Sequence, residues 1–238
     1  IGIVGNSGEL YWFVNGTSLL VVLGGTLSAT LVNYSMKSLL GVLQVLKKVF
    51  IRESYEYQLV IKEIVQKAEL ARKSGLVSLE NELNEIDDKF LRNGIELAIN
   101  ERDSKRLRTF LALEMENIER RHASGQEIFF YMGAYAPAFG MLGTIIGLII
   151  MMNNFAGAKT VGLVETLDFD IAEKFAGLLG GMGLALITTF YGVLLSNLVF
   201  LPIGGKLKRR SEEELMLRNI IVEGIMRIHA REHPILIQ

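Results

Sequence analysis

The sequence predicts an all-α membrane protein with a helical cytoplasmic domain. Half of its 238 residues are hydrophobic and its mean hydropathy is positive, which is high for a soluble domain of this length. Three runs, residues 10–36, 128–158 and 175–205, contain no charged side chain. Because a helix needs roughly 20 apolar residues to cross the hydrocarbon core of a bilayer, each run is long enough to span a membrane.

Basic residues mark one end of each run and assign its orientation. Lys37 follows the first run, Arg120 and Arg121 precede the second, and Lys206 and Lys208 follow the third. Ends rich in Lys and Arg face the cytoplasm, so the first run enters the membrane from outside. An earlier helix is needed to carry the chain out, which predicts four transmembrane helices in the full protein, with the first one largely missing here.

The segment between the first two runs is highly charged, and its apolar residues recur at three-to-four-residue spacing. This periodicity is typical of amphipathic helices, and one apolar set is Leu59, Ile61, Ile64, Val65 and Ala68. We therefore predict the following parts: a remnant of the first transmembrane helix with an outer loop (1–9), transmembrane helix 2 (10–36), a cytoplasmic helical domain (37–127), transmembrane helix 3 (128–158), an outer loop (159–174), transmembrane helix 4 (175–205) and a cytoplasmic C-terminal helix (206–238).

Small residues form a stripe along each of the last two runs, and three threonines accompany them. Close helix packing explains the glycines, because small residues let helix backbones approach in lipid. Thr144, Thr188 and Thr189 have two explanations: a hydrogen bond to the carbonyl one turn back, or a polar lining for a small cation. Neighbouring residues point about 100° apart on a helix, so Thr188 and Thr189 cannot both face one cavity.

Two prolines lie within or beside these runs. Pro137 is near the start of the second run and Pro202 is near the cytoplasmic end of the third. Each removes a helix hydrogen bond. Each could mark the end of a helix, or could act as a hinge that links the membrane helices to the cytoplasmic domain.

The three runs contain no Asp, Glu, Lys, Arg or His. A proton or sodium path normally needs an ionisable group in the membrane. If this chain moves ions, the carboxylate must come from a partner helix or from the missing first helix. The chain has no Cys and only three scattered His, so we expect no metal site, no cofactor and no enzymatic activity. We also expect no nucleic-acid partner.

Two longer motifs are more specific. They are Ala-Pro-Ala-Phe-Gly-Met-Leu-Gly-Thr-Ile-Ile-Gly-Leu at 136–148 and Thr-Thr-Phe-Tyr-Gly-Val-Leu-Leu-Ser-Asn-Leu-Val-Phe-Leu-Pro at 188–202. They resemble the third and fourth transmembrane helices of the MotA and PomA family, the stator subunits of the bacterial flagellar motor. Residues 24–30 resemble its second helix, and residues 223–225 resemble its C-terminal helix. The resemblance covers essentially the whole chain.

The resemblance implies an ion-conducting complex in the bacterial inner membrane. It implies a homopentamer around the single membrane helices of MotB- or PomB-type partners, whose aspartate carries H+ or Na+. Thr144, Thr188 and Thr189 match the family's ion-pathway pattern. The cytoplasmic domain would push the rotor protein FliG, and Arg72 and Glu80 match the family's rotor-facing Arg and Glu, although a solvated helix face is the alternative reading of both.

Three other functions remain open on the residues alone. An ExbB- or TolQ-type energiser of outer-membrane processes has similar helices, but typically has one span before the insert, whereas the first run here enters from outside. A passive membrane scaffold fits the absence of charge in the runs. A substrate transporter is the third alternative.

Overall fold

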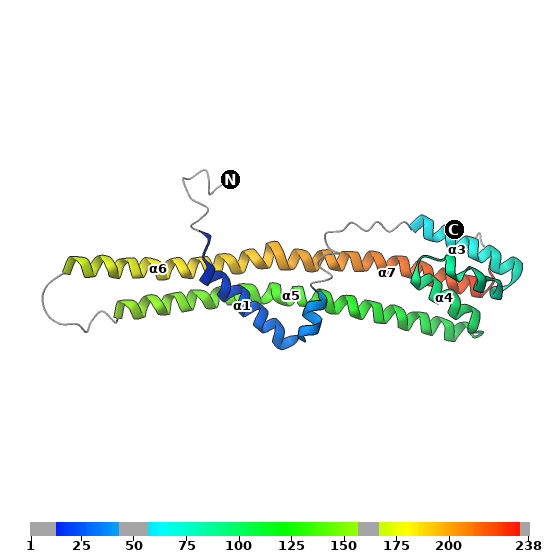
Figure 1. The fold of residues 1–238 in the computed structure, drawn as a ribbon, viewed down its shortest axis with the longest axis horizontal. Coiled ribbons are helices and arrows are strands. Elements are labelled where there is room, and N and C mark those ends of the chain that lie inside the picture. The colour runs from blue at the N-terminus through cyan, green and yellow to red at the C-terminus, as the bar shows by residue number, and fades with distance from the viewer. Residues whose placement is uncertain (1–12, 43–56, 157–166, 234–238) are drawn as a thin grey trace. The chain divides into compact units, whose positions relative to one another are not determined.

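The computed structural model describes residues 13–42, 57–156 and 167–233, and these ranges are helical with no strand. The predicted all-α fold is therefore confirmed. The elements in chain order are α1 (Gly16–Asn33), a helical segment at 36–42, α3 (Tyr57–Ser74), the 3-10 helix η3 (Leu76–Glu85), α4 (Lys89–Asn100), α5 (Ser104–Ala156), α6 (Leu167–Leu194), the π-helical turn η5 (Leu195–Phe200) and α7 (Leu201–His229) (Figure 1).

Three of the described helical stretches are long and apolar enough to cross a membrane: Gly16–Asn33, Ser104–Asn153 and Phe175–His229. They contain most of the three uncharged runs. Large apolar side chains on them are exposed, among them Leu20, Ile145, Met152, Leu186 and Leu198. Such a surface suits a lipid environment, because exposed apolar area of this extent is uncommon on soluble monomers. The predicted remnant at 1–9 lies outside the described residues.

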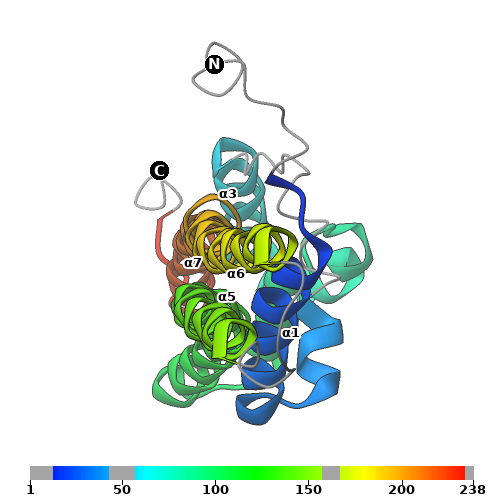
Figure 2. The same ribbon diagram turned by 90° about the vertical axis from the view of Figure 1, so that its left-hand side faces the viewer.

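The chain forms two compact units, each described here by itself. The membrane unit comprises the described residues of Ile1–Lys47 and Gly125–Gly205, and the cytoplasmic unit comprises those of Lys48–Ser124 and Lys206–Gln238. Helix α5 contributes residues to both units. In the membrane unit, α1, α5 and α6 lie side by side (Figure 2).

The cytoplasmic unit has an apolar core built from several helices. Helix α4 starts at the N-cap Asp88, whose carboxylate accepts a hydrogen bond of 2.8 Å from the Leu91 amide. Its buried face then meets α7, where Gly94 makes room for the end of the Ile225 side chain. The fully buried large side chains of this core are Ile64, Leu79, Ile86, Leu91, Ile95, Leu107, Leu111, Ile221, Ile225 and Ile228.

Candidate functional site

Helices α5 and α6 approach closely along the predicted stripes of small residues. A Cβ atom added to Gly147 of α5 would lie 2.9 Å from the carbonyl oxygen of Gly181 and 3.0 Å from the amide nitrogen of Ala185 in α6. These distances leave no room for a side chain, so the stripes pack against each other. We call this contact the α5–α6 seam; it comprises Gly140, Gly143 and Gly147 of α5 and Gly181, Ala185, Thr188 and Gly192 of α6.

Thr188 is buried in the seam, with 1% of its surface exposed. A Cβ atom on Gly143 would lie 2.5 Å from the Cβ atom of Thr188, so the threonine fills the space that this glycine leaves open. Its hydroxyl donates a hydrogen bond of 2.9 Å to the carbonyl oxygen of Ala185. Thr188 is thus a packing residue of the single chain with its hydroxyl turned to its own helix.

Thr144 and Thr189 have a different environment from Thr188. Both are partly exposed. The Thr144 hydroxyl donates to the carbonyl oxygen of Met141 at 2.5 Å, and the Thr189 hydroxyl lies 3.5 Å from that of Ala185. The hydroxyls of Thr188 and Thr189 therefore share one acceptor, the carbonyl oxygen of Ala185. Their exposure differs because neighbouring residues point about 100° apart on a helix.

The two prolines occupy unlike positions. Pro137 lies inside α5, which continues on both sides of it, so it does not end the helix. Pro202 is the second residue of α7, and one residue, Leu201, separates it from the π-helical turn η5. A π turn is rare and is often found at functional positions in helices.

Helix α1 packs against the other two membrane helices through a face with several hydroxyl groups. Its buried residues are Ser18, Val22, Thr26 and Thr30, and its Gly25 accommodates the ring of Phe139 from α5. The two threonines donate to carbonyls of their own helix, at 2.6 and 2.7 Å. Hydroxyls satisfied in this way are compatible with a tightly packed membrane helix.

Tyrosine side chains contact both ends of α1. At its start, the Tyr191 hydroxyl of α6 donates to the carbonyl oxygen of Phe13 at 2.5 Å and accepts from the amide of Asn15 at 3.1 Å. At its other end, Asn33 donates to the hydroxyl of Tyr135. The ring of Tyr34 lies 6.1 Å from that of Tyr131.

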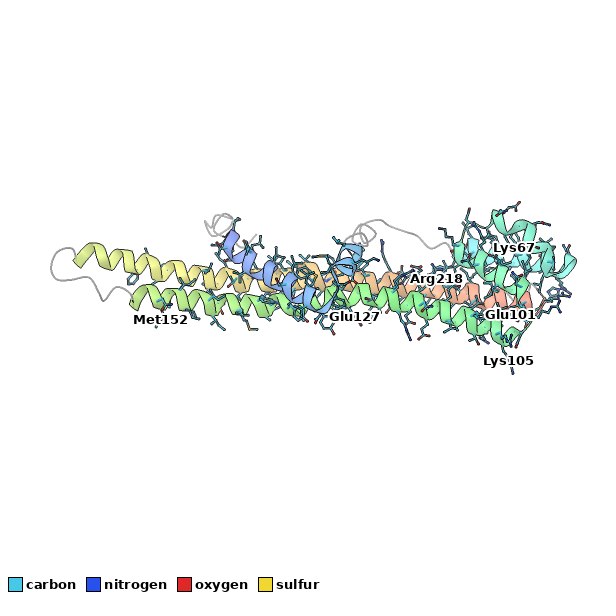
Figure 3. All side chains as sticks on the ribbon, turned by 60° about the horizontal axis from the view of Figure 1, so that its bottom comes forward. Lys67, Glu101, Lys105, Glu127, Met152 and Arg218 are labelled. Atoms are coloured by element: carbon cyan, nitrogen blue, oxygen red, sulfur yellow. The ribbon has the colours of Figure 1, made fainter. Side chains whose placement is uncertain are left out.

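In the cytoplasmic unit, α3 and η3 form a helical hairpin. Gly75 makes the turn with φ +88°, a backbone conformation that favours glycine. The Ser78 hydroxyl donates to the Gly75 carbonyl oxygen at 2.7 Å, and the buried Leu79 joins the core. Lys67 of α3 pairs with Glu82 of η3, with 2.5 Å between Nζ and Oε2. The pair joins the two arms of the α3–η3 hairpin. Lys67 is labelled in Figure 3.

Arg72 and Glu80 lie on opposite arms of this hairpin. Arg72 is in the last turn of α3 and Glu80 is in η3, and both side chains are exposed. Within the part of the chain that the structure describes, neither forms an ion pair. Exposure is required for a contact with another protein, and it equally fits a solvated helix face.

One carboxyl group in this region has an altered acidity. Burial raises the pKa of the Glu63 side chain above its usual range. The ammonium group of Lys67 lowers it in part, while the carboxylates of Asp87 and Asp88 raise it further.

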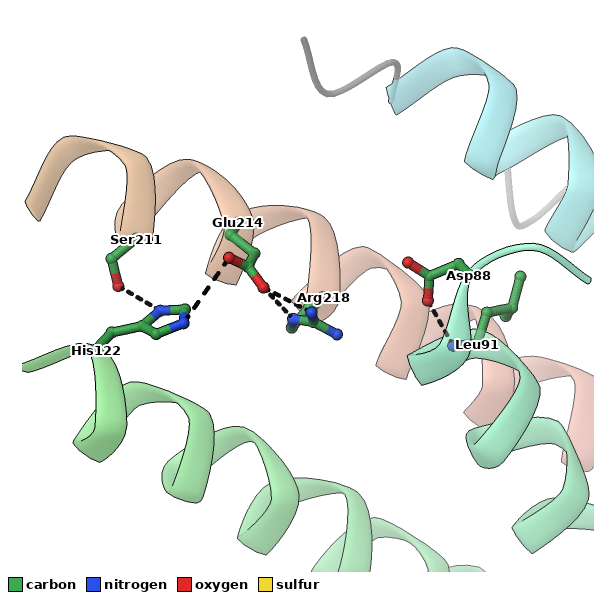
Figure 4. A network of polar contacts seen from close by, with 6 residues as sticks. All are labelled: Asp88, Leu91, His122, Ser211, Glu214 and Arg218. Carbon is green, nitrogen blue, oxygen red and sulfur yellow. Dashed lines mark hydrogen bonds and ion pairs between the residues drawn. The ribbon is translucent and has the colours of Figure 1, made fainter. Parts of the chain in front are cut away.

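A polar network ties α5 to α7 (Figure 4). His122 Nδ1 lies 3.0 Å from Ser211 Oγ, and its Nε2 lies 3.9 Å from the Glu214 carboxylate. Glu214 accepts hydrogen bonds of 3.0 and 2.6 Å from Arg218, whose guanidinium group lies over the ring of Phe90 in α4. The Ser211 side chain is buried, so this serine, histidine and glutamate join helices and do not present a nucleophile.

Several residues with specific contacts were not singled out from the sequence. Tyr191 lies in the motif at 188–202, where a polar side chain in an otherwise apolar run was the available signal. Ser196 belongs to the stripe of small residues on the third run, where its small size was interpreted as a packing feature and its hydroxyl was given no partner. The sequence did not indicate that Lys67 and Glu82 form an ion pair, because charged residues are frequent throughout the segment between the first two runs.

Comparison with known proteins identifies relatives over nearly the whole chain. The sequence matches the MotA/TolQ/ExbB proton channel family over residues 82–220. It is 34% identical over 236 residues to the uncharacterized protein YtxD of Bacillus subtilis (strain 168), covering 98% of this chain and 80% of that protein. It is 33% identical over 227 residues to the chemotaxis protein PomA of Vibrio alginolyticus, covering 95% and 82%.

The fold is also similar to a solved structure. A chain of the flagellar MotAB stator complex from Bacillus subtilis superposes with a TM-score of 0.80 at 28% sequence identity. The match covers 99% of this chain and 87% of that chain.

Proposed function

The chain belongs to the MotA/TolQ/ExbB proton channel family, and on that premise we propose that it is a stator subunit of the bacterial flagellar motor. The similarity to a MotAB stator chain over almost the whole sequence carries this proposal. The similarity to PomA supports the same function. An ExbB- or TolQ-type energiser has less support, since the flagellar proteins match in both sequence and fold.

The complex would use an ion-carrying carboxylate from a partner chain. The three uncharged runs of this multi-pass membrane protein contain no Asp, Glu, Lys, Arg or His, and an ion path normally requires such a group. A MotB- or PomB-type subunit with a single membrane helix would supply it, inside a homopentamer in the bacterial inner membrane. The transported ion is H+ or Na+, and the chain works without a cofactor or an enzymatic step of its own.

Within this complex, the three threonines have different roles. Thr144 and Thr189 are partly exposed and are the better placed to line an ion path shared with a partner helix. Thr188, which fills the α5–α6 seam, would shape that path by holding the helices at their close distance.

The prolines and the α3–η3 hairpin would carry motion to the rotor. Pro137 and Pro202 act as hinges, and the position of Pro137 inside a continuous helix together with the π turn before Pro202 supports this role. The hairpin presents Arg72 and Glu80 on its two arms for contact with the rotor protein FliG.

Deleting the gene tests the function, provided that filaments and swimming are scored separately. We expect cells that assemble filaments but do not swim, with swimming restored by the gene on a plasmid. Normal swimming after deletion, or the loss of filaments, would contradict the proposal. Swimming speed measured against Na+ concentration at fixed pH, with and without a proton uncoupler, then identifies the ion.

A further inference from the structure

Pro137 leaves one carbonyl oxygen of α5 without its usual donor. In an α-helix the amide of residue 137 would donate to the carbonyl of residue 133, and proline has no N–H group. Gly133 is buried. A buried carbonyl without a donor is unfavourable, so another group must satisfy the Gly133 oxygen.

Ser196 is that donor. Its hydroxyl lies 2.6 Å from the carbonyl oxygen of Gly133, and its side chain is 3% exposed. Thr26, Thr30 and Thr188 donate to carbonyls of their own helices, as hydroxyl groups in membrane helices commonly do. Ser196 instead donates across to α5, at the one carbonyl that Pro137 sets free.

Ser196 belongs to the π turn that precedes the second proline. The amide of Leu201 donates to the carbonyl oxygen of Ser196, five residues earlier. Pro202 cannot donate, and its ring would crowd the carbonyl four residues earlier in a regular α-helix. The wider π turn relieves this crowding, so the turn that holds Ser196 is the local response to Pro202.

The helices are in close contact on both sides of this hydrogen bond. A Cβ atom on Gly133 would lie 2.7 Å from Cδ2 of Leu201, the residue before Pro202. One on Gly192 would lie 3.2 Å from the Cα atom of Pro137. Neither segment can shift far without meeting the other, because interiors packed at this density do not deform continuously.

We propose that Ser196 is a positioning residue that couples the two prolines, so that a change in the bend of α5 at Pro137 is transmitted to the π turn before Pro202. The hydrogen bond itself is independent of the function of the protein. Its importance for motion rests on the proposed function as a stator subunit.

A double-mutant cycle tests the coupling. Ser196→Ala is made with Pro137 present and again with Pro137→Ala, which restores an N–H group for the Gly133 carbonyl. Thermal unfolding of the full chain in its purified membrane complex is followed by circular dichroism. With Pro137 present, we expect Ser196→Ala to lower the Tm by about 5 °C. With Ala at position 137, we expect a loss of less than about 1 °C.

Controls separate this coupling from a general packing role. Ser196→Thr keeps the hydroxyl and should keep the Tm and the swimming speed of the parent. Thr30→Ala removes a buried hydroxyl that donates within its own helix, and its effect should be the same in both backgrounds. Equal losses for Ser196→Ala in both backgrounds would overturn the coupling.

Swimming speed is the second readout of the same cycle. Ser196→Ala should slow cells that depend on this chain, and the double variant should be no slower than Pro137→Ala alone. Additive slowing would overturn the coupling. Failure of the parent gene to restore swimming would overturn the stator function instead, and would leave the unfolding cycle as the test of the coupling.

Discussion

At the residue scale, Lys67 is a charged side chain with little contact with solvent. It is 9% exposed, whereas its partner Glu82 is 35% exposed. Removing Glu82 leaves a nearly buried ammonium group without its ion-pair partner, while removing Lys67 leaves a carboxylate that can turn to water. The two halves of this ion pair are therefore unequal in their importance for folding.

We expect Glu82→Met to lower the free energy of unfolding by about 1–2 kcal/mol, discounted for the exposure of the pair. Lys67→Met should lower it by less than about 1 kcal/mol, and the double variant should recover most of the loss. Thermal unfolding of the purified chain measures all three. Lys73→Met, which breaks an exposed pair with Glu69, is the control and should be nearly neutral. Equal losses for the two single variants would show that the pair behaves as a surface pair.

Glu63 predicts a pH dependence. Because its pKa is raised in the folded state, the folded chain holds this proton more tightly, and the ionised carboxylate reduces stability above the folded pKa. Glu63→Gln should therefore raise the Tm at neutral pH. The gain should shrink as the pH falls through the raised pKa and disappear below the pKa of an ordinary glutamate. A gain that is constant with pH would exclude a protonation effect.

The sequence predicted residue types better than residue partners. Gly140, Gly147, Gly181 and Gly192 were interpreted correctly as packing positions, because small residues at helical spacing indicate close contact. Gly177, at the same spacing, meets nothing within 4 Å. The hydrogen bonds of Ser196 to Gly133 and of Tyr191 to Phe13 join residues 63 and 178 positions apart. Such partners depend on how helices meet, which periodicity does not reveal. The proposed roles of Thr144, Thr188 and Thr189 in ion passage stay predictions.

At the element scale, the glycines of α6 divide into two groups. Gly181 and Gly192 touch α5, whereas a Cβ atom on Gly177, Gly180 or Gly183 would meet nothing within 4 Å. A Gly→Ala substitution in α6 should therefore lower stability on the side that faces α5, and should be neutral or slightly stabilising on the other side.

Gly192→Ala should destabilise the chain by about 1–3 kcal/mol, because the added carbon would lie 2.7 Å from the Ala136 carbonyl oxygen. Gly183→Ala is the matched control and should be neutral or slightly stabilising, since alanine favours helix. The Tm of each purified variant measures the difference. A similar loss at both positions would contradict the close approach of α5 and α6.

The helical fold class was predicted from the sequence, and the irregular turns were not. The apolar helices follow from uncharged runs, which have a simple signal in composition. The 3-10 helix η3 has no such signal. Pro202 accounts for the π turn η5, but a proline at this position does not by itself distinguish a π turn from a helix end. Amphipathic periodicity was also only partly right: Ile64 is fully buried, but Leu59 of the same set is 57% exposed.

At the scale of the whole molecule, the exposed charges of the α3–η3 hairpin form either a contact surface or a solvated face. Reversing these charges distinguishes the two. The double reversal Arg72→Glu with Glu80→Lys should reduce swimming speed several-fold while leaving the amount of protein in the membrane fraction unchanged. The physical reason is that like charges would then face each other across the proposed rotor contact. Arg102→Glu, at another exposed arginine, is the control. Unchanged swimming in the double reversal would return both residues to a solvated face.

The fastened ends of α1 have a consequence for the surrounding lipid. With 18 residues between Gly16 and Asn33, the helix is about 27 Å long, slightly shorter than a hydrocarbon core of about 30 Å. Tyr191 at one end and Tyr135 at the other hold it by hydrogen bonds, so it cannot lengthen by adding a turn. A helix shorter than the hydrocarbon core is matched by local thinning of the bilayer, by flanking side chains that reach the interface, or by oligomerisation. The stability of this protein should therefore depend on the length of the lipid acyl chains. We expect α1 to be strained first in bilayers of long-chain lipids, because these are thicker.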